Sequence, residues 1–380
     1  MDQNDKLNLI KKHAPILWLH EKEAFLPTNC KVVVQISDLY RKGKKESEQN
    51  QPKELDDLGK IPKSEQCYLK IKDLDMRDFT IPESYQKSIP ELGPAAIAKL
   101  ARLKYGNDYA TLNIPANDPN LPKYYARVSE IEIRQRQGEP FTEYYKAKDP
   151  GLFGKYTFIE YFFYFVYNDS WNQHQGDWDS MVEIYIKNDR KYMITHLHTT
   201  QWICELPDSS RDLNSCFKHW NGLKKDKLGQ AYVMSGHPYV FVAQGAHAGY
   251  PTPGFTMHGL DVPGIISRDD FLTNTDERQI GRLCILPDDV NEETIRTNLR
   301  FANIDANRVQ FGRWKAPELI DNQPWLKYKG KWGEDTKYLG WDGPQNPPVS
   351  RPPDRRNLQS VLQKISYSGG SVLRSWHGVR

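Results

Sequence analysis

Residues 156–167 read YTFIEYFFYFVY, and this segment decides the fold class of the chain. Aromatic and apolar side chains fall on both faces of an extended backbone here, which is typical of a central strand buried on both sides. The next strong pattern runs from Trp178 to Lys187, where alternate residues from Trp178 to Ile186 fall on one face. The two patterns together indicate neighbouring strands of a buried sheet.

Further short runs extend this pattern along the chain. Asn, Gly and Pro residues separate them, and the runs lie at residues 13–20, 31–36, 124–133, 192–201 and 238–244. One helix is expected over 95–105, where apolar residues recur at helical spacing before Gly106. We therefore predict a mainly β protein, an antiparallel β-sandwich with long polar loops and one or two peripheral helices.

The expected organisation is a single sandwich domain over residues 1–345. Residues 1–12 are interpreted as a polar lead-in, and the nearly all-polar residues 41–66 as an insertion that forms a surface loop or is disordered. A Pro-rich C-terminal tail follows over residues 346–380.

Charge and composition exclude several classes of protein. The 380 residues contain 52 Lys and Arg against 49 Asp and Glu, so the net charge of 52 − 49 = +3 is too small to drive polyanion binding, and no nucleic-acid partner is expected. No apolar run approaches the roughly 18–20 residues of a transmembrane helix. The first residues lack the apolar core of a secretory signal. We therefore expect a cytoplasmic protein without a transmembrane segment, with signal-independent export as the alternative.

The richest cluster of metal-capable residues is NDSWNQHQGDWD, residues 168–179. Asp177 and Asp179 share one face of an extended chain, and His174 precedes them across Gly176. An imidazole and two same-face carboxylates suit a divalent cation, Ca²⁺ or Mg²⁺ in preference to Zn²⁺ or Mn²⁺. We predict His174, Asp177 and Asp179 as metal ligands. The alternative is a solvated loop with Trp178 in the core.

Two histidine segments supply candidates for acid–base chemistry. His196 and His198 share a strand face, and His247 lies in a Gly- and Pro-rich loop that follows a strand. We predict His198 and His247 as catalytic groups, since imidazole titrates near neutral pH. Hydrogen-bonded core histidines and a tight turn are the respective alternatives.

Aromatic residues near glycines suggest a ligand-binding wall. Tyr250 follows His247 in the same loop, and Trp332 lies in YKGKWG, residues 328–333. We predict both as ligand-binding residues, with edge packing as the alternative for the Trp332 segment. The sequence contains no nucleophile elbow, no phosphate-binding P-loop and no HExxH motif.

These motifs, in this order, resemble the plant and fungal family named after vacuolar protein sorting-associated protein 62. The resemblance spans residues 14–348 through short stretches: APILWLHEKE (14–23) with LP (26–27), the strand ending at 167–168, HQGDWD (174–179), the strand holding His198, GAHAGYP (245–251), GKWG (330–333) and GP (343–344). This chain has Asp179 where the family usually has Glu, which shortens the carboxylate's reach. It has Ala246 where the family usually has Ser, so no hydroxyl is present there.

The HQGDWD motif also resembles that of the necrosis- and ethylene-inducing peptide-like proteins, which are β-sandwiches with a bound divalent cation. That resemblance implies His174, Asp177 and Asp179 as ligands, with Gly176 in the place of a second His and Asp169 as a looser candidate. In that family the metal helps the protein to engage sphingolipid head groups, which implies a lipid-head-group ligand here.

Two functions of different classes follow. The first is a metal-dependent hydrolase or related transferase acting on a small molecule, with His198 or His247 as the general base. The second is a non-catalytic binder of lipid head groups or glycans, linked to membrane trafficking or membrane attack. A third, weaker expectation is a scaffold that uses PQNP, residues 344–347, as a proline-rich ligand.

Overall fold

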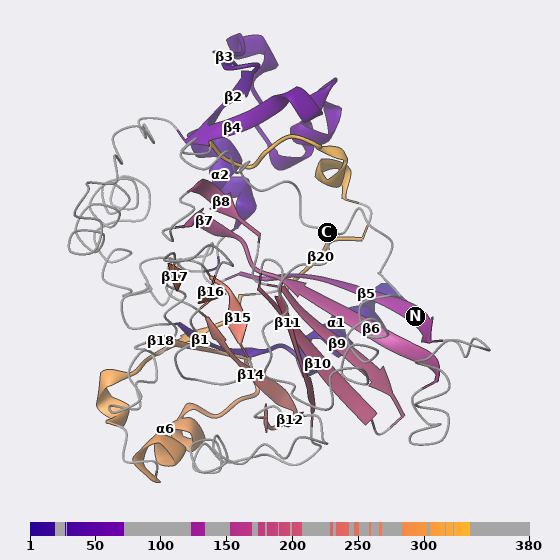
Figure 1. The fold of residues 1–380 in the computed structure, drawn as a ribbon, viewed down its shortest axis with the longest axis vertical. Coiled ribbons are helices and arrows are strands. Elements are labelled where there is room, and N and C mark those ends of the chain that lie inside the picture. The colour runs from indigo at the N-terminus through magenta and orange to yellow at the C-terminus, as the bar shows by residue number, and fades with distance from the viewer. Residues whose placement is uncertain are drawn as a thin grey trace.

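The computed structural model shows a mainly β architecture (Figure 1). The residues that it describes are 1–19, 27, 29–71, 123–133, 153–168, 174–178, 181–188, 190–197, 200–206, 229–230, 233–242, 247–250, 258–259, 266–267, 283–301, 305–315, 317–321 and 323–334. The predicted fold class is confirmed. The helix expected over 95–105 and the tail over 346–380 lie outside these residues.

The larger sheet has seven strands in the order β12-β11-β10-β9-β6-β5-β20. Its five central strands pair antiparallel and two short edge strands pair parallel. The strands are β5 (Tyr125–Ile133), β6 (Gly154–Phe162), β9 (Met181–Lys187), β10 (Arg190–Leu197), β11 (Thr200–Glu205), β12 (Gly229–Gln230) and β20 (Glu318–Leu319).

The second sheet has six strands and adds parallel pairs to the antiparallel pattern. β1 pairs parallel with β14 and antiparallel with β18, and β18 pairs parallel with β19. Its members are β1 (Ile16–Leu19), β13 (Val233–Met234), β14 (His237–Val242), β15 (Gly249–Tyr250), β18 (Leu283–Leu286) and β19 (Gln310–Arg313).

The two sheets enclose one hydrophobic core. Leu17 and Leu19 of β1 pack in the same cluster as Ile159 of β6 and Ile184 of β9. The opposite face of the six-stranded sheet packs against helix α6 (Glu292–Phe301) through Ile295 and Leu299 of the helix. Apolar side chains on both faces of β1 explain why it is the buried centre of its sheet.

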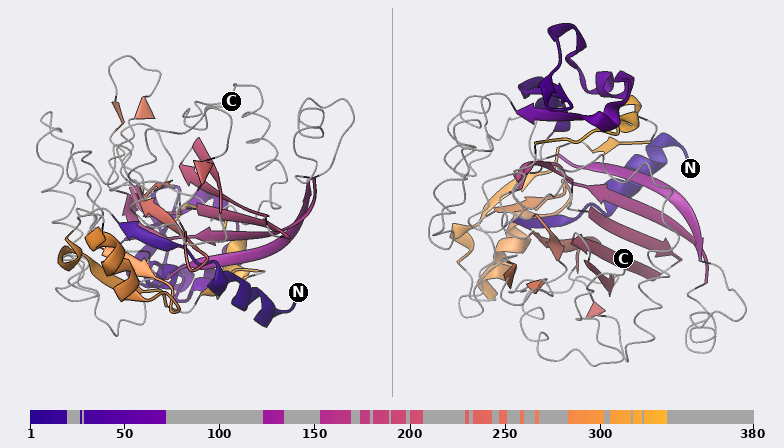
Figure 2. Two further views of the ribbon diagram at one scale, coloured as in Figure 1. Left: turned by 90° about the horizontal axis from the view of Figure 1, so that it is seen from below. Right: turned by 45° about the horizontal axis from the view of Figure 1, so that its top comes forward.

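The expected polar lead-in is a helix, α1 (Gln3–Lys12), so that interpretation was wrong. The Asp2 carboxylate caps it by accepting from the amide of Asp5 at 2.8 Å. Ile10 is buried, and its carbonyl accepts from the hydroxyl of Tyr161 at 2.9 Å. α1 therefore lies against the sandwich rather than leading away from it, as Figure 2 shows.

The strand expected over 31–36 is also wrong, because these residues form helix α2 (Cys30–Ile36). The Asn29 side chain caps it by accepting from the amide of Lys31 at 3.0 Å. Val33 and Val34 are buried in the core. Capping and tertiary packing here outweigh the β-preference of the valines.

The polar segment over 41–66 is folded, so the expected loop or disorder was wrong. A three-stranded sheet holds it, with short 3₁₀ helices between the strands: β2 (Ser37–Arg41), β3 (Lys44–Lys45), β4 (Cys67–Ile71), η1 (Glu48–Asn50), η2 (Leu55–Lys60) and η3 (Ser64–Gln66).

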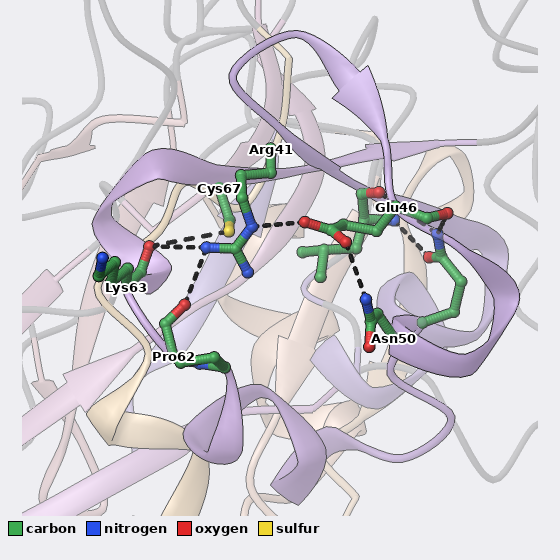
Figure 3. Close-up of polar contacts among 8 residues, drawn as sticks. Arg41, Glu46, Asn50, Pro62, Lys63 and Cys67 are labelled. Carbon is green, nitrogen blue, oxygen red and sulfur yellow. Dashed lines mark hydrogen bonds and ion pairs between the residues drawn. The ribbon is translucent and has the colours of Figure 1, made fainter.

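One guanidinium organises this segment (Figure 3). Arg41 donates to the carbonyls of Pro62 at 2.9 Å and Lys63 at 3.3 Å, and it pairs with the carboxylate of Glu46. The Asn50 amide donates to the same carboxylate at 3.0 Å. These polar contacts hold the loops together with the packing of Leu58 in the core.

Smaller elements complete the described chain. They are the hairpin β7 (Phe165–Asn168) and β8 (His174–Asp177), the pair β16 (His258–Gly259) and β17 (Ile266–Ser267), and the 3₁₀ helices η8 (Ala306–Arg308) and η9 (Pro324–Lys327). Among the described residues, no helix has both the length and the apolar character that a bilayer crossing requires.

Candidate functional site

The HQGDWD motif begins on a short hairpin at one end of the seven-stranded sheet. β7 follows β6, β8 leads towards β9, and Phe165 pairs with Asp177 and Asn168 with His174. Gly176 has a φ of +70°, and a Cβ there would lie 2.6 Å from the Trp332 carbonyl oxygen. Glycine is therefore required for the hairpin to approach the 331–334 segment closely.

Two further contacts hold the motif in place. The backbone amide of Gln175 donates to the carbonyl of Glu334 at 3.1 Å. The side-chain oxygen of Gln175 accepts from the amide of Ile71 at 2.9 Å. The hairpin is thus fixed between β4 and the 331–334 segment, which gives its acidic end a defined position.

The central contact of the site joins two predicted residues. Nδ1 of His247 donates to Oδ2 of Asp177 at 2.9 Å, and neither side chain has any exposed surface. The proton on Nδ1 leaves Nε2 of the neutral ring as an acceptor. The backbone of His247 has a φ of +55°, an uncommon conformation for a non-glycine residue.

Two residues that sequence reasoning did not select hold this pair. The ring of Phe165 stacks on that of His247, with centroids 3.8 Å apart and planes 3° from parallel. The amide of Asn168 is buried and donates to Oδ2 of Asp177 at 3.3 Å. Asn168 begins the metal-capable cluster of the sequence, so its polarity was visible. Its contact with Asp177 needs the hairpin register.

His174 is buried at the start of β8, and its Nδ1 donates to the carbonyl of Gly176 at 2.8 Å. This bond fixes the tautomer in which Nε2 carries the lone pair. Metal-binding histidines commonly have their other nitrogen held by such an acceptor. His174 therefore fits the ligand role predicted for it.

The remaining members of the predicted metal site lie outside the described residues. These are the predicted ligand Asp179 and the looser candidate Asp169, and the predicted catalytic residue His198 lies outside them as well. Within the part of the chain that the structure describes, no three His, Cys, Asp or Glu side chains form a group that could hold a metal ion. The cation stays a prediction.

The predicted ligand-binding aromatics have different surroundings. Trp332 is fully buried and packs against Trp178, Trp325 and Tyr164, with centroids 5.5–5.6 Å apart. It therefore belongs to the core rather than to an exposed platform. Burial also raises the pKa of Tyr328 at the border of this cluster. Tyr250 lies in β15, whose backbone alone is described at this position.

No protein-family model, no curated protein and no solved structure matches this chain significantly. The two family resemblances and the functions that they imply therefore remain predictions.

Proposed function

We propose that this protein is a hydrolase or group-transfer enzyme in which Nε2 of His247 is the general base and Asp177 orients it. The hydrogen bond of 2.9 Å between Nδ1 of His247 and Asp177 carries the proposal. A carboxylate on Nδ1 holds the ring in one tautomer and stabilises the imidazolium that forms when Nε2 takes a proton.

Burial strengthens this arrangement. A hydrogen bond with no exposed atoms is electrostatically stronger than one in water, because the effective dielectric constant is low. The parallel stacking of Phe165 restricts rotation of the His247 ring. Since the ring exposes no surface, a substrate reaches Nε2 only when the chain around it opens, so the proposal includes such a motion.

A divalent cation forms the second part of the proposal, with His174, Asp177 and Asp179 as its ligands. His174 fits because its Nδ1 is held by the Gly176 carbonyl. Such a cation would polarise a phosphoryl or carbonyl oxygen and lower the pKa of water. The residues of this chain orient the substrate oxygen and accept the proton at Nε2 of His247.

The experiment measures metal content and turnover on the same purified chain. Metal is determined by elemental analysis after chelation and after loading with Ca²⁺, Mg²⁺, Mn²⁺ or Zn²⁺. Turnover is measured on p-nitrophenyl esters and on phosphate mono- and diesters. We expect His247→Gln and Asp177→Asn each to lower turnover about 10²- to 10⁴-fold at unchanged circular dichroism.

His237→Gln is the matched control. His237 is equally buried and also bonds a carboxylate, that of Asp289. It begins β14, whereas His247 follows that strand's other end. Equal activity in the native protein and His247→Gln would refute the catalytic role. Metal-dependent binding to sphingolipid vesicles or glycans without turnover would replace it with the head-group- or glycan-binding function.

A further inference from the structure

The segment that joins α1 to β1 is held by side chains from distant parts of the chain. Nδ1 of His237 donates to the carbonyl of Ala14 at 2.8 Å, and Nε1 of Trp314 donates to that of Pro15 at 2.8 Å. The amide of Ala14 bonds the carbonyl of Lys11 at 3.2 Å at the end of α1. These contacts fix the exit of the helix against the sandwich.

His13 makes a similar contact in the opposite direction, to the chain beside His237. The His13 ring is hydrogen-bonded to the backbone of Gly236, the residue before His237. Ser235 and Gly236, with φ of +53° and +87°, form the tight turn between β13 and β14 that presents this backbone. Each histidine therefore bonds the peptide beside the other, and both rings are buried.

The two rings differ in their acceptors. His237 faces an acceptor at each nitrogen, the Ala14 carbonyl at 2.8 Å and the Asp289 carboxylate at 3.1 Å. Nδ1 of His13 is buried and has no hydrogen-bond partner among the described residues. A proton added there would have no acceptor, whereas the neutral ring needs none at that atom.

The surrounding charges also oppose a proton on His13. Lys12 at the end of α1, Lys191 on β10 and His237 on β14 face it, and the carboxylate of Asp289 bonds His237. Burial first, then Lys191 and Lys12, lower the pKa of His13 to about 4.

We propose that His13 and His237 form a proton-operated clamp, which holds α1 on the sandwich while His13 is neutral and releases the helix when His13 takes up a proton. The direction of this pH dependence follows from proton linkage. His13 has a pKa of 6.5 in an open state and about 4 in the closed one, so the open state binds the proton more tightly. The opening constant therefore rises about tenfold per pH unit as the pH falls from 6.5 to 4.

Hydrogen exchange of the full chain, followed by mass spectrometry from pH 7 to pH 3 and corrected for intrinsic rates, measures this opening. Peptides that cover α1 are compared with a peptide that covers β4. We expect the protection of α1 to fall about tenfold per pH unit below pH 6.5 and to level off near pH 4. Protection of β4 stays constant or follows a different profile.

His13→Gln keeps a donor of similar reach but cannot take a proton, so its α1 protection should not vary with pH by more than about twofold. The same pH slope in His13→Gln as in the native chain, or a flat native profile, would overturn the clamp.

Lys12→Gln is the second variant, because it removes a repelling charge from an exposed position and leaves the rings in place. We expect it to move the lower bend of the profile upward by about half a pH unit. If the lower bend of the Lys12→Gln profile does not move, these charges do not set the protonation of His13. The proposal would then fail, even if His13→Gln loosened α1 at every pH.

Discussion

Two glutamates face each other in the middle of the seven-stranded sheet, and their charges predict a measurable pH dependence of stability. Glu160 of β6 pairs directly with Glu183 of β9, and both are buried. Arg127 contacts Glu160 at 2.5 Å, and the hydroxyl of Tyr185 donates to Glu183 at 2.5 Å. Glu160 therefore has a guanidinium partner and a second buried carboxylate beside it.

The magnitude follows from the pKa of Glu160. Burial, with the charge of Glu183 adding to it, raises this pKa from 4.5 to about 7 in spite of Arg127. A shift of about 2.5 units corresponds to roughly 3 kcal/mol. Because the folded pKa is the higher one, this stability is fully present below pH 4.5 and is lost as the pH rises to 7 and above.

The assay is denaturant unfolding of the native chain and Glu160→Gln at intervals from pH 4.5 to pH 8. Glutamine keeps the shape of the side chain and cannot ionise, so we expect the native chain to lose about 3 kcal/mol relative to the variant over this range. Glu48→Gln, at an exposed position, should follow the native curve. Parallel curves for the native chain and Glu160→Gln would refute the reasoning.

Two further predictions concern the packing of the fold. Gly176→Ala should lower the free energy of unfolding by more than about 2 kcal/mol in thermal melts, because its methyl group would meet a Trp332 carbonyl at a φ of +70°. Gly43→Ala is the control. Gly43 has a φ of +78° with open space around it, so this variant should lower the free energy of unfolding by less. Arg41→Met should make the 37–71 segment at least tenfold more sensitive to limited proteolysis, since four polar contacts shown in Figure 3 depend on it directly or through Glu46. Unchanged cleavage in Arg41→Met would show that other contacts order this segment.

The strands were predictable where the hydrophobic pattern is strong. The run 124–133 contains β5, and the run 156–167 covers most of β6 and of β7, because burial on one or both faces dictates their composition. The single strand expected over 156–167 is divided, since β6 pairs with β9 whereas β7 pairs with β8. The wrong prediction for residues 41–66 has its cause in contacts remote in sequence. Arg41 reaches Pro62 across the polar segment, and the hydroxyl of Ser64 accepts from the amide of Lys329 at 3.0 Å. No local pattern encodes such contacts.

The candidate site, too, was predictable in its residues but not in the contacts between them. Sequence alone selected Asp177 and His247 as chemically competent residues, yet it assigned them to different parts of the site. The strand that follows His247 pairs with β14, and the β7–β8 hairpin turns Asp177 towards the same place. Their bond is a product of topology, as is the stacking of Phe165 on His247.

The state of the His247 ring is the most direct test of the catalytic pair. Long-range ¹H–¹⁵N spectra of the native chain, Asp177→Asn and His247→Gln identify its two ring nitrogens. We predict that the neutral ring carries its proton on Nδ1 in the native chain and that Asp177→Asn changes this signal. A proton on Nε2, or a spectrum unaffected by Asp177→Asn, would contradict the assignment of His247 as a base oriented by Asp177.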